Sequence, residues 1–136
     1  MINTGVNRAA VTVPGSLTCE PKRPQTGWWG NEQESGRGFF LEWQNGWLDI
    51  AGYMYDDAGN SVWYLTVGEI GGSAAARSFG GTWWSYGNGQ TLTGAWRQNV
   101  RTNGSVAPVT ITFSGPDTAL MTLPNGRTTS LRRHRF

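Results

Sequence analysis

Residues 38–67 read GFFLEWQNGWLDIAGYMYDDAGNSVWYLTV, and this segment decides the fold. Two turn signals, Asn45-Gly46 and Asp57-Ala58-Gly59, divide it into three runs rich in apolar and aromatic residues. Asn-Gly is favoured in two-residue hairpin turns because both central residues need a positive φ. The pattern therefore predicts an antiparallel meander of three strands.

The Asn45-Gly46 turn also predicts the register of the first hairpin. The expected pairs are Gln44 with Trp47, Trp43 with Leu48, Glu42 with Asp49, Leu41 with Ile50, and Phe40 with Ala51. Because side chains alternate between the faces of a strand, two faces separate. The apolar one is predicted to face the core, and it carries Phe39, Leu41, Trp43, Leu48, Ile50 and Met54. The opposite face carries Phe40, Glu42, Gln44, Trp47, Asp49, Tyr53 and Tyr55.

This second face is the predicted ligand-binding surface. A three-residue loop at Asp57-Ala58-Gly59 pairs Tyr53 with Trp63 and adds that ring to the face. Rings beside two opposed carboxylates suit an ammonium-type ligand. The expected binding residues are Glu42, Trp47, Asp49, Tyr53 and Trp63. The alternative is an ordinary solvated sheet face, on which exposed carboxylates repel only weakly.

Two tryptophan doublets, Trp28-Trp29 and Trp83-Trp84, add further rings. Neighbouring residues of a strand point to opposite faces, so one ring of each doublet is expected in the core and the other at the surface. Trp28 and Trp84 are the predicted additional aromatic contacts. The alternative is that both doublets close the ends of a barrel.

Turn signals continue at regular intervals as far as Asn125-Gly126, which is typical of an all-β protein. Strands are predicted near residues 38–44, 47–55, 61–69, 77–86, 91–98, 106–113, 118–123 and 128–135. An up-and-down barrel is favoured because closure removes unpaired strand edges, and a two-sheet sandwich is the alternative. Residues 26–136 are expected to form one domain, preceded by a flexible arm over residues 1–25 that contains three prolines.

Composition narrows the classes of partner. Charged residues make up 15% of the 136 residues and the net charge is +2, so no nucleic-acid partner is expected. The basic residues crowd the C-terminus at Arg127, Arg132, Arg133 and Arg135, where a charged row is expected to keep a terminal edge strand from pairing with other chains. A phosphate-binding edge is the alternative. Arg37 is expected to form a salt bridge with Glu34 or Glu32.

Catalytic and metal-binding patterns are weak. Cys19 is the only cysteine, which excludes an intrachain disulfide and a metal site with four cysteine ligands. His134 is the only histidine and has no nucleophile at motif spacing. The Glu42–Asp49 pair has the spacing of a retaining glycosidase, as any acidic cross-strand pair would. We therefore expect a non-enzymatic protein without cofactor or metal.

No run approaches the roughly 18 to 20 apolar residues of a membrane span, and polar residues interrupt the N-terminus where a secretory signal would need an apolar core. The chain as written is expected to be soluble and cytoplasmic, with no membrane partner. A leader removed before this sequence begins would instead imply an exported protein.

The run TGWWGNEQESGRGFFLE at residues 26–42 resembles a module found in many uncharacterised bacterial proteins. The runs AGYMYDDAGNSVWY at residues 51–64 and LPNGRT at residues 123–128 are similar to the same module. The resemblance implies no settled activity and no residue roles. The size of the chain also resembles that of proteins encoded by mobile gene cassettes.

Together these features predict a tryptophan-rich binding module for a small organic ligand, cationic ligands included. A carbohydrate-binding module is the first alternative. A structural or self-associating protein, with the rings in a homo-oligomer interface, is the second.

Overall fold

The structure is a computed structural model, and it describes residues 23–73, 76–102 and 108–136. Residues 1–22, which make up most of the expected N-terminal arm, lie outside the described residues. In the described ranges the chain forms ten strands and no helix. The strands are β1 (Gly27–Gly30), β2 (Gly38–Gln44), β3 (Trp47–Tyr55), β4 (Ser61–Ser73), β5 (Ala76–Thr82), β6 (Trp84–Gly87), β7 (Val100–Thr102), β8 (Pro108–Phe113), β9 (Thr118–Thr122) and β10 (Thr128–Arg133).

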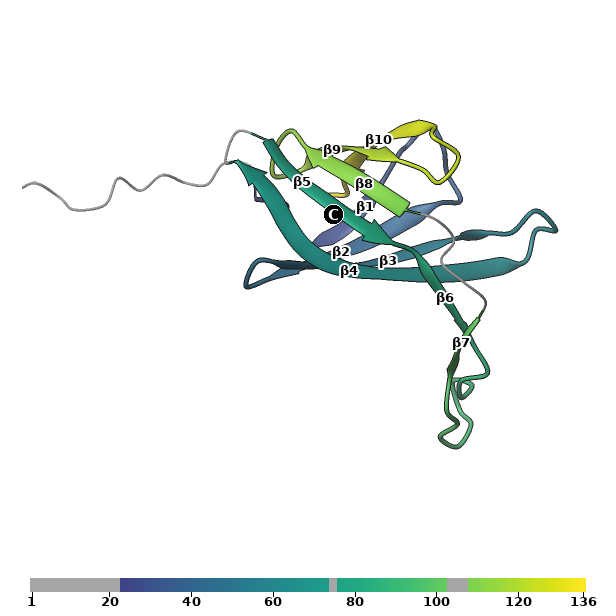
Figure 1. Cartoon of the computed structure of the whole chain (residues 1–136). Coiled ribbons are helices and arrows are strands. Elements are labelled where there is room, and N and C mark those ends of the chain that lie inside the picture. Colours follow the sequence, from purple (N-terminus) through teal and green to yellow (C-terminus); the bar gives the residue numbers. More distant parts are fainter. Residues whose placement is uncertain (1–22, 74–75, 103–107) are drawn as a thin grey trace, which may run out of the picture.

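Eight of these strands close an antiparallel barrel in the order β3-β2-β1-β10-β9-β8-β5-β4, with β4 pairing back onto β3. The barrel predicted from the turn pattern is thus confirmed, rather than the sandwich. The remaining strands, β6 and β7, form a hairpin that leaves the barrel from β4 and projects away from it (Figure 1). We call residues 84–102 the arm, which is distinct from the N-terminal arm expected over residues 1–25.

The length of β4 explains how the arm leaves the barrel. One edge of β4 pairs with β3 over residues 61–69. Its other edge is divided: Ile70 to Ser73 pair with β5, whereas Tyr64 and Leu65 pair with β6. The strand is therefore interrupted at Trp83, between β5 and β6, and β6 continues beyond the barrel wall.

Several predicted strand positions were wrong. The expected strand at 77–86 is two strands, β5 and β6, because they pair with two different parts of the same edge of β4. The expected strand at 91–98 is a loop, since no neighbouring strand in the described residues pairs with it. The sequence reading also missed β1, a short strand that closes the barrel between β2 and β10.

The hairpin registers were predicted correctly. Every pair expected across the first hairpin is present, from Gln44 with Trp47 to Phe40 with Ala51. Asn45 and Gly46 have φ values of 49° and 88°, as a two-residue turn of this kind requires. Tyr53 also pairs with Trp63, as expected from the second turn.

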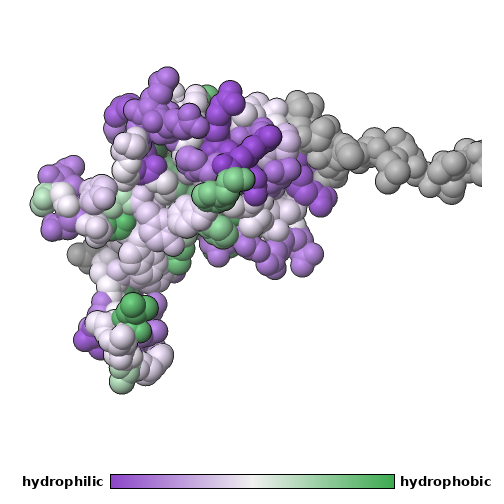
Figure 2. All heavy atoms as spheres, turned by 180° about the vertical axis from the view of Figure 1, so that it is seen from behind, coloured by the Kyte–Doolittle hydropathy of each residue, from purple (hydrophilic) through white to green (hydrophobic). Residues whose placement is uncertain are grey.

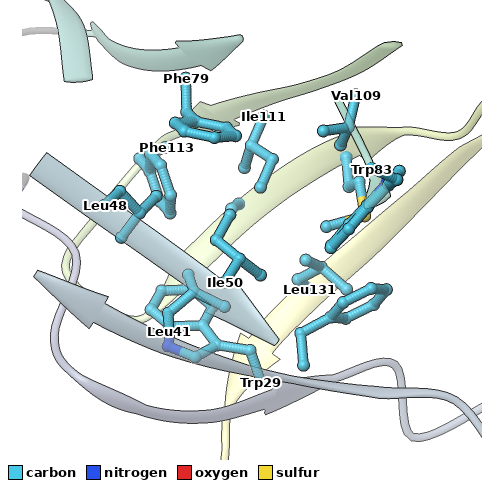
Figure 3. Close-up of a cluster of buried hydrophobic side chains, with 13 residues drawn as sticks. Trp29, Leu41, Leu48, Ile50, Phe79, Trp83, Val109, Ile111, Phe113 and Leu131 are labelled. Atoms are coloured by element: carbon cyan, nitrogen blue, oxygen red, sulfur yellow. The ribbon is translucent and has the colours of Figure 1, made fainter. Parts of the chain in front are cut away.

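Side chains fill the barrel (Figure 3). Of the predicted core face, Phe39, Leu41, Leu48 and Ile50 are fully buried, and Trp43 and Met54 pack against them. The rest of the buried apolar set comes from the other strands and the β5–β6 junction, and comprises Trp29, Phe79, Trp83, Val109, Ile111, Phe113, Ala119, Met121 and Leu131. Each tryptophan doublet therefore sends one ring, Trp29 or Trp83, into the core.

The C-terminal arginines do not protect an edge, because β10 pairs with both β1 and β9. Two of them form salt bridges instead: Arg127 with Glu34, and Arg135 with Asp117. Arg133 Nε donates a hydrogen bond to the carbonyl of Thr26. The expected salt bridge of Arg37 is confirmed, with Glu34 as its partner.

Candidate functional site

Aromatic side chains gather on the outer face of one side of the barrel, and they continue onto the arm. Cross-strand pairing aligns Trp28 with Phe40, and Tyr53 with Trp63. Leu65 pairs with Trp84, which carries the same face onto β6 and places Tyr86 on it as well. We call this set the ring cluster: Trp28, Phe40, Tyr53, Trp63, Trp84 and Tyr86.

Ring contacts join the cluster in two groups, which the strand pairing of Tyr53 with Trp63 sets side by side. The centroid of Trp28 lies 5.5 Å from that of Phe40 and 5.6 Å from that of Tyr53. Trp63 stacks on Tyr86 at 5.6 Å with only 10° between the ring planes. The guanidinium of Arg101 lies 3.9 Å above the Trp84 ring. Such contacts are favourable beyond the area they bury and fix the ring orientations.

The rings remain accessible despite these contacts. Trp28 and Trp63 are each 42% exposed and Tyr53 is 46% exposed. They border a shallow hollow of about 530 Å³, which Tyr55 and Gly36 also line. Large contiguous apolar patches on protein surfaces commonly take part in interactions.

A second hollow, of about 390 Å³, lies where the ring cluster meets the arm. Trp63 and Tyr86 form its aromatic side. Its other side comes from the loop between β6 and β7, with the carboxamides of Asn88, Gln90 and Asn99. Trp63 borders both hollows, which are therefore neighbours on the surface.

The predicted acidic residues lie at the other end of the same face. Glu42 and Asp49 are directly opposed, as expected. Asp49 is four residues from Tyr53 on β3, a separation of about 13 Å along an extended strand. Trp47 lies further along the strand, where it pairs with Glu69. The structure thus brings Tyr53 and Trp63 together with Trp28, but places Glu42, Asp49 and Trp47 apart from them.

The carboxylates of this acidic end have few partners. Glu42 Oε1 accepts a hydrogen bond of 2.7 Å from the Gln44 side chain. Within the described ranges, no salt bridge involves Glu42 or Asp49. Among the described residues, no group of three or more His, Cys, Asp or Glu side chains is placed to hold a metal ion.

A third hollow, of about 360 Å³, opens at one mouth of the barrel and was not foreseen from the sequence. Its floor includes Phe39, Tyr64 and Trp83, and its rim includes Arg37 and Arg127. Both arginines already bind the carboxylate of Glu34. One carboxylate balances only one of these two positive charges, and Asp57 also lines the hollow.

The sequence signal for the arm residues of the cluster was present but incomplete. Trp84 was predicted as an aromatic contact, and alternation along the strand then places Tyr86 on the same face. The amide side chains of the arm loop, Asn88, Gln90 and Asn99, were missed; they flank residues 91–98, which were expected to form a strand.

No protein-family model matches the chain, and no curated protein or solved structure is significantly similar to it. The described residues contain no helix long and apolar enough to cross a membrane.

Proposed function

We propose that this protein is a non-enzymatic binding module that takes a small organic ligand on the ring cluster. One observation carries the proposal: three partly exposed rings, Trp28, Tyr53 and Trp63, converge on one hollow from three different strands. Large rings supply much contact area for stacking at a low cost in side-chain freedom.

The rigidity of the surface supports the same proposal. The rings stand on paired strands of a closed barrel, and their mutual contacts already fix their orientations. Ordering side chains on binding costs roughly 0.5–1.5 kcal/mol for each flexible one. A surface ordered in advance avoids most of that cost.

A cation site at the acidic end is the second candidate. Glu42 and Asp49 oppose each other without a salt bridge in the described part of the chain, and like charges directly opposite are destabilising. An ammonium group between them would remove that repulsion. The exposed ring of Trp47, on the same end of β3, could add a cation–π contact.

Tryptophan fluorescence titrated with aromatic, amine and saccharide panels tests the proposal and separates the candidates. Binding at the ring cluster is expected to be lost in Trp63→Ala and Trp28→Ala and retained in Glu42→Gln. A cation at the acidic end reverses this pattern. Trp96→Ala is the matched control, because it removes an exposed tryptophan that lies outside both hollows bordering Trp63.

Light scattering after size exclusion tests the self-association alternative in parallel. A monomer whose fluorescence responds to a ligand through Trp63 supports the binding module. An oligomer that dissociates in Trp28→Ala or Trp63→Ala, with no ligand response in the parent protein, would refute the proposal and identify the ring cluster as a subunit contact.

A further inference from the structure

We propose that the ligand is a neutral carbohydrate chain, long enough to occupy both hollows that border Trp63. This inference rests on the proposed function and names its ligand class. It adds the second hollow to the binding site, and the polar side of that hollow comes from the arm.

The arm side of the second hollow is amide-rich and uncharged. It is lined by Asn88, Gln90 and Asn99, together with the backbone at Gly87 and Gly89. Each carboxamide offers two N–H donors and a carbonyl acceptor. Neighbouring hydroxyl groups of a sugar both donate and accept, so they match carboxamides well. A charged ligand would find no opposite charge in this lining.

The amides are available to a ligand because their bonds within the protein are long or absent. Asn88 Nδ2 and Gln98 O are 3.4 Å apart, and Gln98 Nε2 and Asn99 Oδ1 are also 3.4 Å apart, both beyond the usual range of N–H···O bonds. The Gln90 side chain has no hydrogen bond within the described ranges. A ligand hydroxyl therefore replaces weak bonds rather than strong ones.

The loop backbone, in contrast, is held firmly. Arg97 donates two hydrogen bonds to the carbonyl of Gly89, from Nη2 at 2.8 Å and from Nε at 3.1 Å. Stacking of Tyr86 on Trp63 ties the base of the arm to the barrel. The loop backbone that carries the amides is thus positioned next to the rings.

The ring-lined hollow supplies the complementary contact. The C–H face of a sugar ring is apolar and packs against an aromatic ring, as at Trp28, Tyr53 or Trp63. One charged residue, Arg37, lines this hollow, and its guanidinium is bound by Glu34. No lining side chain of either hollow offers an unpaired charge; Arg97 and Arg101, which lie beside the second hollow, are engaged by the Gly89 carbonyl and the Trp84 ring.

The sizes of the hollows favour a chain over a single sugar. Their volumes of about 530 and 390 Å³ each fall in the range of roughly 300–1,000 Å³ typical of ligand sites. Trp63 borders both hollows and one face of its ring is covered by Tyr86, so a ligand that reaches both hollows has to pass the exposed part of that ring and is longer than a single sugar. A longer oligosaccharide is expected to gain affinity that a short one cannot.

The experiment compares disaccharides and hexasaccharides of the same linkage, using β-1,4-linked glucose, xylose and N-acetylglucosamine and α-1,4-linked glucose as probes. Affinities are measured by isothermal titration calorimetry for the parent protein, Trp63→Ala, the double variant Gln90→Ala/Asn99→Ala, and the control Trp96→Ala. Denaturant unfolding checks that each variant is folded.

We expect at least one hexasaccharide to bind about tenfold more tightly than its disaccharide, which corresponds to about 1.4 kcal/mol. The double variant should lose this gain and leave the disaccharide affinity unchanged. Trp63→Ala should abolish both, whereas Trp96→Ala should change neither. Raising the salt concentration to 0.5 M should have little effect, because the ligand is uncharged.

Two results overturn the inference. Equal affinity for long and short saccharides, or an unaffected double variant, removes the arm from the site. Absence of saccharide binding refutes a carbohydrate ligand. The same calorimetry with a panel of aromatic amines then separates the carbohydrate inference from the proposed binding function. Amine binding that depends on Trp63 leaves the proposed function standing, whereas no binding of either class refutes both.

Discussion

The barrel and the arm are both antiparallel β-structure, yet they are stabilised in different ways. Every barrel strand has two neighbours, and together the strands enclose a buried apolar core. The arm has two short strands and no core of its own. Two-stranded hairpins of this kind are marginally stable in water. The arm therefore depends on contacts at its base.

Those contacts are aromatic and polar rather than apolar and buried. Trp63 stacks on Tyr86, Arg101 covers Trp84, and Ser85 Oγ lies 2.6 Å from Thr102 Oγ1. Further out, Leu92 is fully exposed and Trp96 is 76% exposed. Figure 2 shows apolar patches on the arm, at the bottom, surrounded by polar surface. Order in this protein therefore has two sources, core burial and surface ring contacts.

The largest expected effect is on the barrel, where Trp29→Ala removes a fully buried ring. Trp29 packs edge-on against Phe113 with ring centroids 5.9 Å apart, and its Nε1 donates to the carbonyl of Gln25. Truncating a buried tryptophan costs about 3–5 kcal/mol. Urea unfolding followed by circular dichroism should show this loss.

Trp96→Ala in the arm is the matched control for that change. The same truncation at an exposed ring is expected to alter the free energy of unfolding by less than about 0.5 kcal/mol. A comparable loss in the two variants would break the distinction between barrel and arm. It would mean that the arm is buried in solution by a second molecule.

The same distinction explains what the sequence could predict. The first hairpin was read in full because Asn45-Gly46 fixes its register and each strand alternates between apolar and polar faces. Trp29 and Trp83 were correctly divided from Trp28 and Trp84 by the same alternation. These are local signals, and local signals determine local pairing.

Predictions failed where a strand depends on which distant neighbour it meets. Residues 91–93 read Thr-Leu-Thr, a strand-like alternation, but no partner strand lies beside them in the described structure. β1 has four residues, too few for a recognisable pattern, and is a strand because β2 and β10 lie on either side of it. The arm and its amide-lined hollow were consequently missed, while the aromatic part of the candidate site was anticipated.

A second prediction concerns polar groups inside the barrel. Thr66 is buried, and its hydroxyl has no hydrogen-bond partner among the described residues. An unpaired buried hydroxyl costs roughly 1–3 kcal/mol. Thr66→Val is therefore expected to stabilise the protein by about 1 kcal/mol, measured by the midpoint of urea unfolding.

Thr129→Val is the control for this variant. Thr129 is also buried, but its hydroxyl donates to Glu34 Oε2 at 3.0 Å and accepts from Asn31 Nδ2 at 3.2 Å. Removing it should destabilise the barrel by about 1–2 kcal/mol. If Thr66→Val were destabilising too, the Thr66 hydroxyl would have to be hydrogen-bonded in solution.

A third, smaller effect tests whether ring contacts hold the arm. Arg101→Met keeps a long side chain and removes the charge above Trp84. An exposed cation–π contact is worth about 0.5–1 kcal/mol. We expect hydrogen exchange at Tyr86 and Arg101, which are paired across the arm, to accelerate by up to about fivefold while global unfolding is unchanged. Unchanged exchange would show that strand pairing alone orders the arm.

The smallest effect is expected at the exposed turn between β3 and β4, which is ordered by neither core burial nor ring contacts. The side-chain amide of Asn60 donates to Asp56 Oδ2 at 3.0 Å, and this bond is the main cause that lowers the pKa of the Asp56 carboxyl. The backbone N–H groups of Asn60 and Ala58 donate to Oδ1 at 2.8 and 3.0 Å and act in the same direction.

A carboxyl whose pKa is lower in the folded state stabilises that state above the unfolded pKa, near 3.9, and loses this contribution as the pH falls through the folded value. The turn should therefore loosen only in acid. Asn60→Ala removes the largest cause, so the pKa of Asp56 should rise towards its usual value in an NMR titration of the side-chain carboxyl. An unchanged pKa would mean that the backbone donors alone hold the carboxylate, and that this turn owes its order to its main-chain conformation.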